Sequence, residues 1–130
     1  MIVLDTSAAV EWLLRTSTGL KIEKRIYSRV ETLHSPHILD LEFAQVMRRL
    51  VREGTISERR ADEGIHDLLD LRVARYPHFT FLPRIWQHRH NLSAYDGAYV
   101  ALAEGLGAPL VTCDRRLAAA SAHQARVEVF

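Results

Sequence analysis

The chain has 130 residues, 48% of them hydrophobic and 25% charged, a balance typical of one globular domain with an ordinary apolar core. Its net charge of +1 provides no overall field for nucleic acid, and the single Cys113 excludes a disulfide framework and any multi-cysteine zinc site. No apolar run approaches the roughly 18 to 20 residues that span a bilayer, and the first five residues do not resemble a signal peptide, so we expect a cytoplasmic protein without a membrane partner.

The first half of the chain predicts strands and helices in alternation. In chain order, these elements are a strand over residues 2–4, a helix over 8–14, a helix over 20–30, a strand around 32–34, and a helix from Ser35-Pro36 to Gly54. Thr6 or Ser7 is the expected cap of the first helix, and Gly19 is the expected break after it. One face of the last helix is apolar through Leu39, Phe43, Val46, Met47 and Leu50.

The second half continues the alternation. In chain order, we expect a helix capped by Ser57 and running to about residue 73, a strand over 78–82, a short helix from Pro83 toward Asn91, a helix capped by Ser93 and ending at Gly105 or Gly107, a strand over 109–112, a short helix over 114–120, and an edge strand over 127–130. Strands separated by helices predict an α/β sandwich around a mainly parallel sheet. No linker or repeat divides residues 1–130, which we expect to form one domain.

Four carboxylates stand where a lone acidic residue is structurally awkward. Asp5 ends the first strand, and Asp114 follows the strand over 109–112. Glu42 borders the apolar face of its helix, and Asp96 lies in the first turn of a helix that is apolar nearly all round. Because ligands of open parallel sheets bind beyond the carboxyl ends of the strands, Asp5 and Asp114 can share one edge. Burying unpaired charge is costly, so four carboxylates brought together would make a site for a hard cation.

Each of these residues also has a structural explanation when it is taken alone. Asp5, Asp96 and Asp114 could each cap a helix or a turn, and Glu42 could pair with Arg49. The argument for a site therefore depends on their joint placement.

Other acidic, histidine and cysteine residues could be mistaken for metal ligands, but their positions do not predict a metal site. An acidic stripe lies opposite the apolar side of its helix and is expected to face solvent; it consists of Glu63, Asp67 and Asp70. His88, His90 and Asn91 are expected at the surface or in a loop, because alternate helix positions point apart. Cys113 is expected to be a buried small side chain. Arginines near the carboxylates, among them Arg115 and Arg116, could position phosphate, although a solvent-exposed role explains them better.

Four segments carry a family resemblance: residues 2–8, Glu42 with its helix, residues 93–103 and residues 110–114. Together they resemble a PIN domain, and more narrowly VapC, the toxin of bacterial type II toxin–antitoxin pairs. The resemblance covers the whole chain in order and length. It implies a PIN-domain α/β/α sandwich over residues 1–130 and an endoribonuclease that hydrolyses RNA phosphodiesters with Mg2+ or Mn2+.

The resemblance also assigns roles to residues. It implies that the metal ligands and catalytic residues are Asp5, Glu42, Asp96 and Asp114, and that the hydroxyls supporting the site are Ser7 and Thr112. Arg116 departs from the family pattern, since many relatives carry an acidic or amide residue there. This departure leaves open whether the site binds one metal ion or two.

Partners are implied in the same way. A VapB-type antitoxin would lie in a groove near the first helices, and we expect a homodimer within a toxin–antitoxin hetero-oligomer. Apolar side chains that could line the groove, or simply pack in the core, are Trp12, Leu13, Leu14, Ile22, Ile26 and Tyr27. Neither the RNA that is cut nor the sequence preference follows from these residues.

Two other functions compete with this one. Phosphotransferases of the haloacid-dehalogenase type and response-regulator receivers also place an Asp at the end of the first strand, but they need a lysine farther along the chain. The only lysines here are Lys21 and Lys24, and Ser7 stands where the dehalogenases carry a second Asp. The other competitor is a catalytically silent PIN module that binds RNA or protein, against which the presence of all four carboxylates argues.

Overall fold

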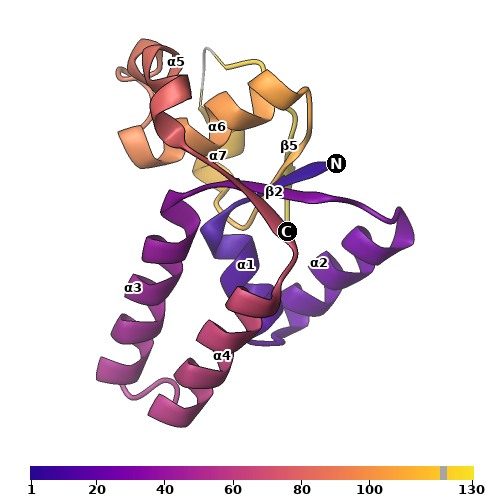
Figure 1. The fold of residues 1–130 in the computed structure, drawn as a ribbon, viewed down its shortest axis with the longest axis vertical. Helices are drawn as coiled ribbons and strands as arrows, with labels where there is room; N and C mark the ends of the chain where they lie inside the picture. The colour runs from indigo at the N-terminus through magenta and orange to yellow at the C-terminus, as the bar shows by residue number, and fades with distance from the viewer. Residues whose placement is uncertain (121–122) are drawn as a thin grey trace.

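The computed structural model describes residues 1–120 and 123–130 and contains a five-stranded sheet in the order β3-β2-β1-β4-β5 (Figure 1). Its strands are β1 (Ile2–Leu4), β2 (Leu33–Pro36), β3 (Val73–Tyr76), β4 (Leu110–Thr112) and β5 (Val127–Val129). Each pairing between these strands is parallel. The predicted parallel sheet is therefore confirmed, with β5 at one edge.

Helices cover both faces of the sheet, which makes the fold an α/β/α sandwich (Figure 1). One layer contains α1 (Thr6–Leu13), α2 (Ser17–Ser28), α3 (Ile38–Arg52) and α4 (Glu58–Asp70). The other contains the 3-10 helix η1 (His78–Phe81), α5 (Leu82–Gln87), α6 (Ala94–Leu106) and α7 (Arg115–Ala119).

The central strand β1 supplies the middle of both cores. Ile2 and Leu4 pack with α1 to α4, while Val3 between them packs with α6 and α7. This alternation follows from the two-residue period of a strand. A strand buried on both faces must be apolar throughout, and all three residues are shielded from water. The same burial fixes the position of Asp5, the next residue.

The third strand is the largest error of the sequence prediction. Residues 78–82 were predicted as a strand, but they form η1 and the start of α5. The strand is Val73–Tyr76, at the position where the helix capped by Ser57 was expected to end. Leu71 adopts an extended backbone and ends α4 three residues early, and β3 then pairs with β2 along its whole length. The alternating apolar residues of 78–82 were misleading because none of them is buried: Phe79 and Leu82 are exposed, and Phe81 is only half-buried.

The helix boundaries in the first half also differ from the prediction. Asp5 caps α1 through its side chain, in place of Thr6 or Ser7. The break after α1 is made by Thr16, which caps α2, and Gly19 lies inside α2. Ser35-Pro36 belongs to β2, where Ser35 donates a buried hydrogen bond to the Leu4 carbonyl. Short polar residues cap helices at several neighbouring positions equally well, so the local sequence does not choose among them.

Among the described residues, no helix has the length and apolar character needed to cross a membrane.

Candidate active site

The four predicted carboxylates line one open cleft at the carboxyl edge of the sheet. The cleft has a volume of about 430 Å³ and is lined by Asp5, Thr6, Ser7, Leu41, Glu42, Gln45, Val46, Asp96 and Asp114. Four separate elements contribute these groups: the end of β1, helix α3, the first turn of α6 and the end of β4. The parallel sheet brings the first and last together, because both strands end at the same edge.

Asp5 is buried and held by two hydroxyls. Ser7 Oγ and Thr112 Oγ1 donate to its Oδ2 over 2.5 and 2.7 Å, and the Ser7 backbone N–H adds a longer bond of 3.3 Å. Burial raises the pKa of Asp5, and the three hydrogen bonds oppose that rise. Because each of these bonds from the described residues ends on Oδ2, Oδ1 is left for a ligand in the cleft.

Ser7 and Thr112 also fix the loop that carries Asp114. Ser7 Oγ accepts the Cys113 backbone N–H over 2.9 Å, and Thr112 Oγ1 accepts the Asp114 backbone N–H over 3.0 Å. The two hydroxyls therefore connect the ends of β1 and β4. The role of Ser7 and Thr112 in supporting a metal site remains a prediction, and these hydrogen bonds show how they would act.

Glu42 is oriented by a hydrogen-bond network that the sequence analysis did not find. Its Oε2 accepts from Thr6 Oγ1 and from Tyr99 OH, each over 2.7 Å, and those two hydroxyls lie 2.6 Å apart. Burial raises the pKa of Tyr99, and the bond to Glu42 raises it further, so the phenol remains a donor. The signal that could have found Tyr99 is its position one turn after Asp96, on the buried side of α6.

Asp96 and Asp114 complete the acidic lining. Asp96 occupies the third position of α6, where its backbone N–H donates to Ser93 Oγ over 3.1 Å. Burial raises the pKa of Asp96, and the charges of Asp5 and Asp114 raise it further. Asp114 caps α7, and the Arg116 guanidinium closes on it and lowers its pKa. The repulsion between these carboxylates shows that three of them share one electrostatic environment.

The donor set suits a hard divalent cation such as Mg2+ or Mn2+, because it consists of carboxylate and hydroxyl oxygens without sulfur or imidazole. Even so, no three acidic, histidine or cysteine side chains within residues 1–120 and 123–130 are gathered closely enough to hold an ion. Glu42 directs one oxygen at Thr6 and Tyr99, and Asp114 faces Arg116. The residues therefore fit a metal in their chemistry and in sharing a cleft. Their roles as ligands remain a prediction.

The other histidine and acidic candidates lie away from the cleft. The acidic stripe of Glu63, Asp67 and Asp70 is exposed, as predicted. His88 lies in the turn that follows α5, as a loop residue would, but it is not at the surface: it is only 2% exposed and its ring lies 3.3 Å from Glu104. A histidine in the turn after a short helix can face inward when a carboxylate on a neighbouring helix accepts its N–H, and the local sequence does not reveal that partner.

Cys113 is half-buried where a buried side chain was expected, and burial raises the pKa of its thiol to about 11. The thiol therefore stays protonated near neutral pH.

The sequence comparisons identify the family of the chain. The PIN domain family matches residues 2–122. The chain is 44% identical over 129 residues to Ribonuclease VapC12 of Mycobacterium tuberculosis, covering 99% of this chain and 98% of that protein. It is 42% identical over 117 residues to Ribonuclease VapC9 of the same organism, covering 90% and 88%. The chain therefore belongs to the PIN-domain family, and within it to the VapC-type ribonucleases.

Solved structures show the same fold. The crystal structure of PAE2754 from Pyrobaculum aerophilum has a TM-score of 0.71 at 24% identity and covers 98% of this chain and 83% of that one. Mycobacterium tuberculosis VapC20, described as a toxin that cleaves the sarcin–ricin loop, has a TM-score of 0.67 at 16% identity, with coverage of 92% and 94%. VapBC2 from Rickettsia felis, bound to a promoter DNA fragment, has a TM-score of 0.67 at 13% identity, with coverage of 99% and 98%. At these identities the likeness concerns the fold alone.

Proposed function

We propose that residues 1–130 form one PIN domain that acts as a divalent-metal-dependent endoribonuclease, the toxin of a VapBC-type toxin–antitoxin pair. The observation that carries this proposal is the gathering of Asp5, Glu42, Asp96 and Asp114 along one cleft. Relatives that match nearly the whole chain are named ribonucleases, which supports RNA as the substrate class. With cellular RNA as the substrate, the cytoplasm is the proposed location.

The residues of the cleft have distinct parts in this chemistry. The carboxylates Asp5, Glu42, Asp96 and Asp114 would hold Mg2+ or Mn2+. When bound, the metal lowers the pKa of a water and offsets charge on the phosphoryl oxygens. Ser7 and Thr112 fix the direction of Asp5, and Thr6 and Tyr99 fix that of Glu42. Because the acidic lining repels an RNA backbone, the same cation is needed for substrate binding as well as for cleavage.

The direct test is cleavage of total RNA by purified protein. We expect Asp5→Asn and Asp96→Asn each to lower the rate at least about 100-fold, more than the loss of a supporting residue costs, with circular dichroism unchanged. EDTA should abolish cleavage and added Mg2+ or Mn2+ should restore it. Asp67→Asn is the matched control, because this carboxylate is exposed on α4 away from the cleft. Full activity in EDTA, or in either cleft variant, would refute the metal site.

The silent PIN module remains the alternative outcome of that experiment. RNA binding without cleavage in the presence of Mg2+ and Mn2+ would favour it. The phosphotransferase alternative loses its basis with membership of the PIN-domain family. In addition, both lysines lie on α2, in a different element from each of the four carboxylates.

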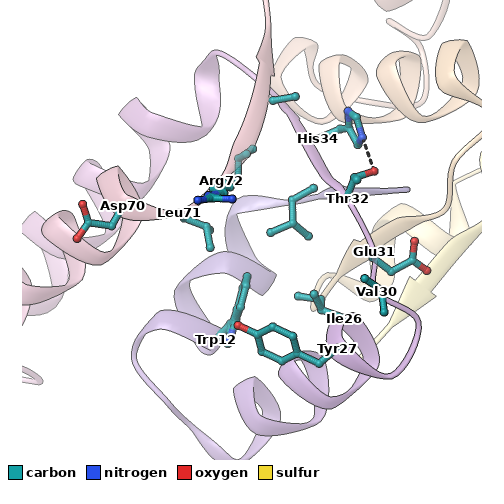
Figure 2. Close-up of a pocket in the computed structure, with 13 residues that line it drawn as sticks. Trp12, Ile26, Tyr27, Val30, Glu31, Thr32, His34, Asp70, Leu71 and Arg72 are labelled. Atoms are coloured by element: carbon teal, nitrogen blue, oxygen red, sulfur yellow. Dashed lines mark hydrogen bonds between the residues drawn. The ribbon is translucent and has the colours of Figure 1, made fainter.

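We also propose that the antitoxin binds an apolar groove beside the first two helices. This groove has a volume of about 780 Å³ and lies between α1 and α2 on one side and the end of α4 with β3 on the other (Figure 2). Three of the predicted apolar residues line it, namely Trp12, Ile26 and Tyr27, whereas Ile22 is fully buried. Tyr27 is 67% exposed and Val30 is 91% exposed, so the groove presents apolar side chains to water, and a partner could cover them.

Co-purification with the co-expressed antitoxin tests this site. Tyr27→Asp should reduce the amount of antitoxin recovered, because it places a charge in the apolar groove. Leu20→Asp is the control, since Leu20 is exposed on the same helix but does not line the groove. If both variants recovered equal amounts of antitoxin, the antitoxin would bind a different surface and the proposed groove would be wrong.

A homodimer is proposed on a separate apolar surface. Four exposed side chains occur on η1, α5 and the start of α6: Phe79, Leu82, Trp86 and Tyr95. Sedimentation of the purified protein should show a dimer that Trp86→Glu weakens. A wild-type monomer at all concentrations would exclude it.

A further inference from the structure

One carboxylate of the acidic cleft is already paired with a positive charge of the chain itself. The Arg116 Nε lies 3.1 Å from both carboxylate oxygens of Asp114, and its Nη2 lies 2.6 Å from Oδ2. The same guanidinium is close enough to Asp96 to oppose the rise in its pKa. Arg116 is therefore paired with one predicted metal ligand, Asp114, and its charge also acts on a second, Asp96.

The guanidinium and the helix cap use Asp114 differently. The Arg116 backbone N–H donates to Asp114 Oδ1 over 2.9 Å, which is the cap of α7. Nη2 donates to Oδ2, and Nε donates to both oxygens. If the guanidinium leaves, the backbone bond can stay on Oδ1 while Oδ2 becomes available. Asp114 can thus change partner without loss of its cap.

We infer that Arg116 is an exchangeable internal cation of this cleft: it holds Asp114 in the metal-free protein, releases it to a divalent ion, and then binds a phosphate of the RNA. The inference rests on the proposed function, which it deepens by naming a positioning residue. It also accounts for the partner of Asp114 in this structure, which is its own arginine.

The exchange is energetically easy because the arginine is exposed. Its side chain is 87% accessible to water, and exposed ion pairs change equilibria by only about 1.5-fold to 5-fold. A divalent ion that gains several carboxylates at once can displace such a partner. A guanidinium released beside the site has the planar fork that suits a phosphate.

Manganese binding to the full chain, followed by electron paramagnetic resonance, tests the first half of the exchange. We expect Arg116→Gln to bind Mn2+ about 2-fold to 5-fold more tightly than Arg115→Gln. Arg115 is the matched control, because its loss changes the net charge equally and it is exposed on the same helix. Arg116→Lys should fall between wild type and Arg116→Gln, because an ammonium replaces the fork by a point charge. Equal Mn2+ affinities for Arg116→Gln and Arg115→Gln would overturn the inference.

RNA binding tests the second half. With a 2′-O-methyl RNA that resists cleavage, Arg116→Gln should weaken binding about 10-fold in Mg2+ and lower the salt dependence by about one phosphate contact. In EDTA it should weaken binding no more than Arg115→Gln does, since Arg116 is then engaged by Asp114. The same loss with and without Mg2+ would also overturn the inference. If the wild type binds no Mn2+ at all, the proposed function fails as well, which distinguishes the two failures.

Discussion

At the scale of single residues, the charge of the buried Asp5 carboxylate lowers the stability of the metal-free fold, although the proposed function needs that charge. The residue must be ionised to bind a cation, yet it is held in a place shielded from water. Ser7 and Thr112 compensate only in part, because the pKa of Asp5 remains raised by burial. Asn can accept the same bonds from Ser7 and Thr112 and caps helices equally well. The cost therefore belongs to the charge and not to the shape of the side chain.

Asp5→Asn should consequently stabilise the metal-free protein. A folded-state pKa above the ordinary value of 3.8 means that stability is lost as the pH rises through the folded pKa. At pH 7 in EDTA, we expect the variant to gain about 1 kcal/mol, or about 3 to 5 °C in melting temperature, with the gain vanishing below about pH 3.8. Thermal unfolding checks this. Mg2+ should raise the melting temperature of wild type alone, and a variant that melts below wild type in EDTA would contradict the prediction.

At the scale of elements, α1 and α2 meet too closely for any residue but glycine at position 19. A Cβ at this position would lie 1.9 Å from the Glu11 carbonyl oxygen and 2.8 Å from the Trp12 Cα. Both contacts are with backbone, so no side chain can move aside. This close approach lets the corner between α1 and α2 form and bury Ile22 and Ile26.

Gly19→Ala should therefore destabilise the fold by about 3 kcal/mol, in the range of strong steric and backbone effects. Urea unfolding measures it. Gly64→Ala is the control, because Gly64 is also helical but its Cβ would meet only the Met47 sulfur at 3.4 Å and the Phe43 ring at 3.8 Å. We expect the control to change stability by no more than about 1 kcal/mol, since alanine favours helix. Similar effects of both substitutions would show that helix propensity, and not the corner, decides the outcome.

Elements with a local signal could be predicted from the sequence, whereas those that depend on distant contacts could not. Buried strands such as Ile2–Leu4 are evident from their apolar runs, and α6 is evident from its Ser93 cap and its end at Gly107. Gly19 indicated a break but not its position, because the reason for the glycine is a contact with Glu11, eight residues away in sequence. The strand β3 was missed for a similar reason. Its residues are half-buried or exposed at a sheet edge, so their conformation is decided by pairing with β2 and not by their own apolar pattern.

At the scale of the whole molecule, the topology decides how much of the site was predictable. The carboxyl ends of β1 and β4 meet because the strands are neighbours in a parallel sheet, so Asp5 and Asp114 could be placed together from their positions in sequence. The hydrogen-bond partners of Glu42 could not be predicted in this way. Thr6 and Tyr99 are separated from it by 36 and 57 residues, and Tyr99 lies in a helix whose apolar residues predict only packing.

Glu104, near the carboxyl end of α6, also joins segments that are distant in sequence. It connects α5, α6 and the segment before β5. Its carboxylate accepts two bonds from Arg84 of 2.7 and 2.9 Å and one of 2.8 Å from the Gln124 backbone N–H. His88 lies 3.3 Å away. Burial alone would raise the pKa of Glu104, but these hydrogen bonds outweigh it and lower the pKa to about 2. The charge of Glu104 therefore stabilises the fold.

Glu104→Gln should destabilise the protein by about 2 kcal/mol at pH 7, less than a fully buried pair would lose because Arg84 is partly exposed. The folded-state pKa lies below the ordinary value of 4.5, so this stability is present above pH 4.5 and is lost as the pH falls toward 2. Urea unfolding from pH 7 to pH 3 should show the two proteins converging as the pH falls. Glu53→Gln, which removes an exposed pair with Arg49, should differ from wild type by less than about 0.5 kcal/mol. A constant difference between Glu104→Gln and wild type would mean that Glu104 acts through packing, because only the contribution of its charge depends on pH.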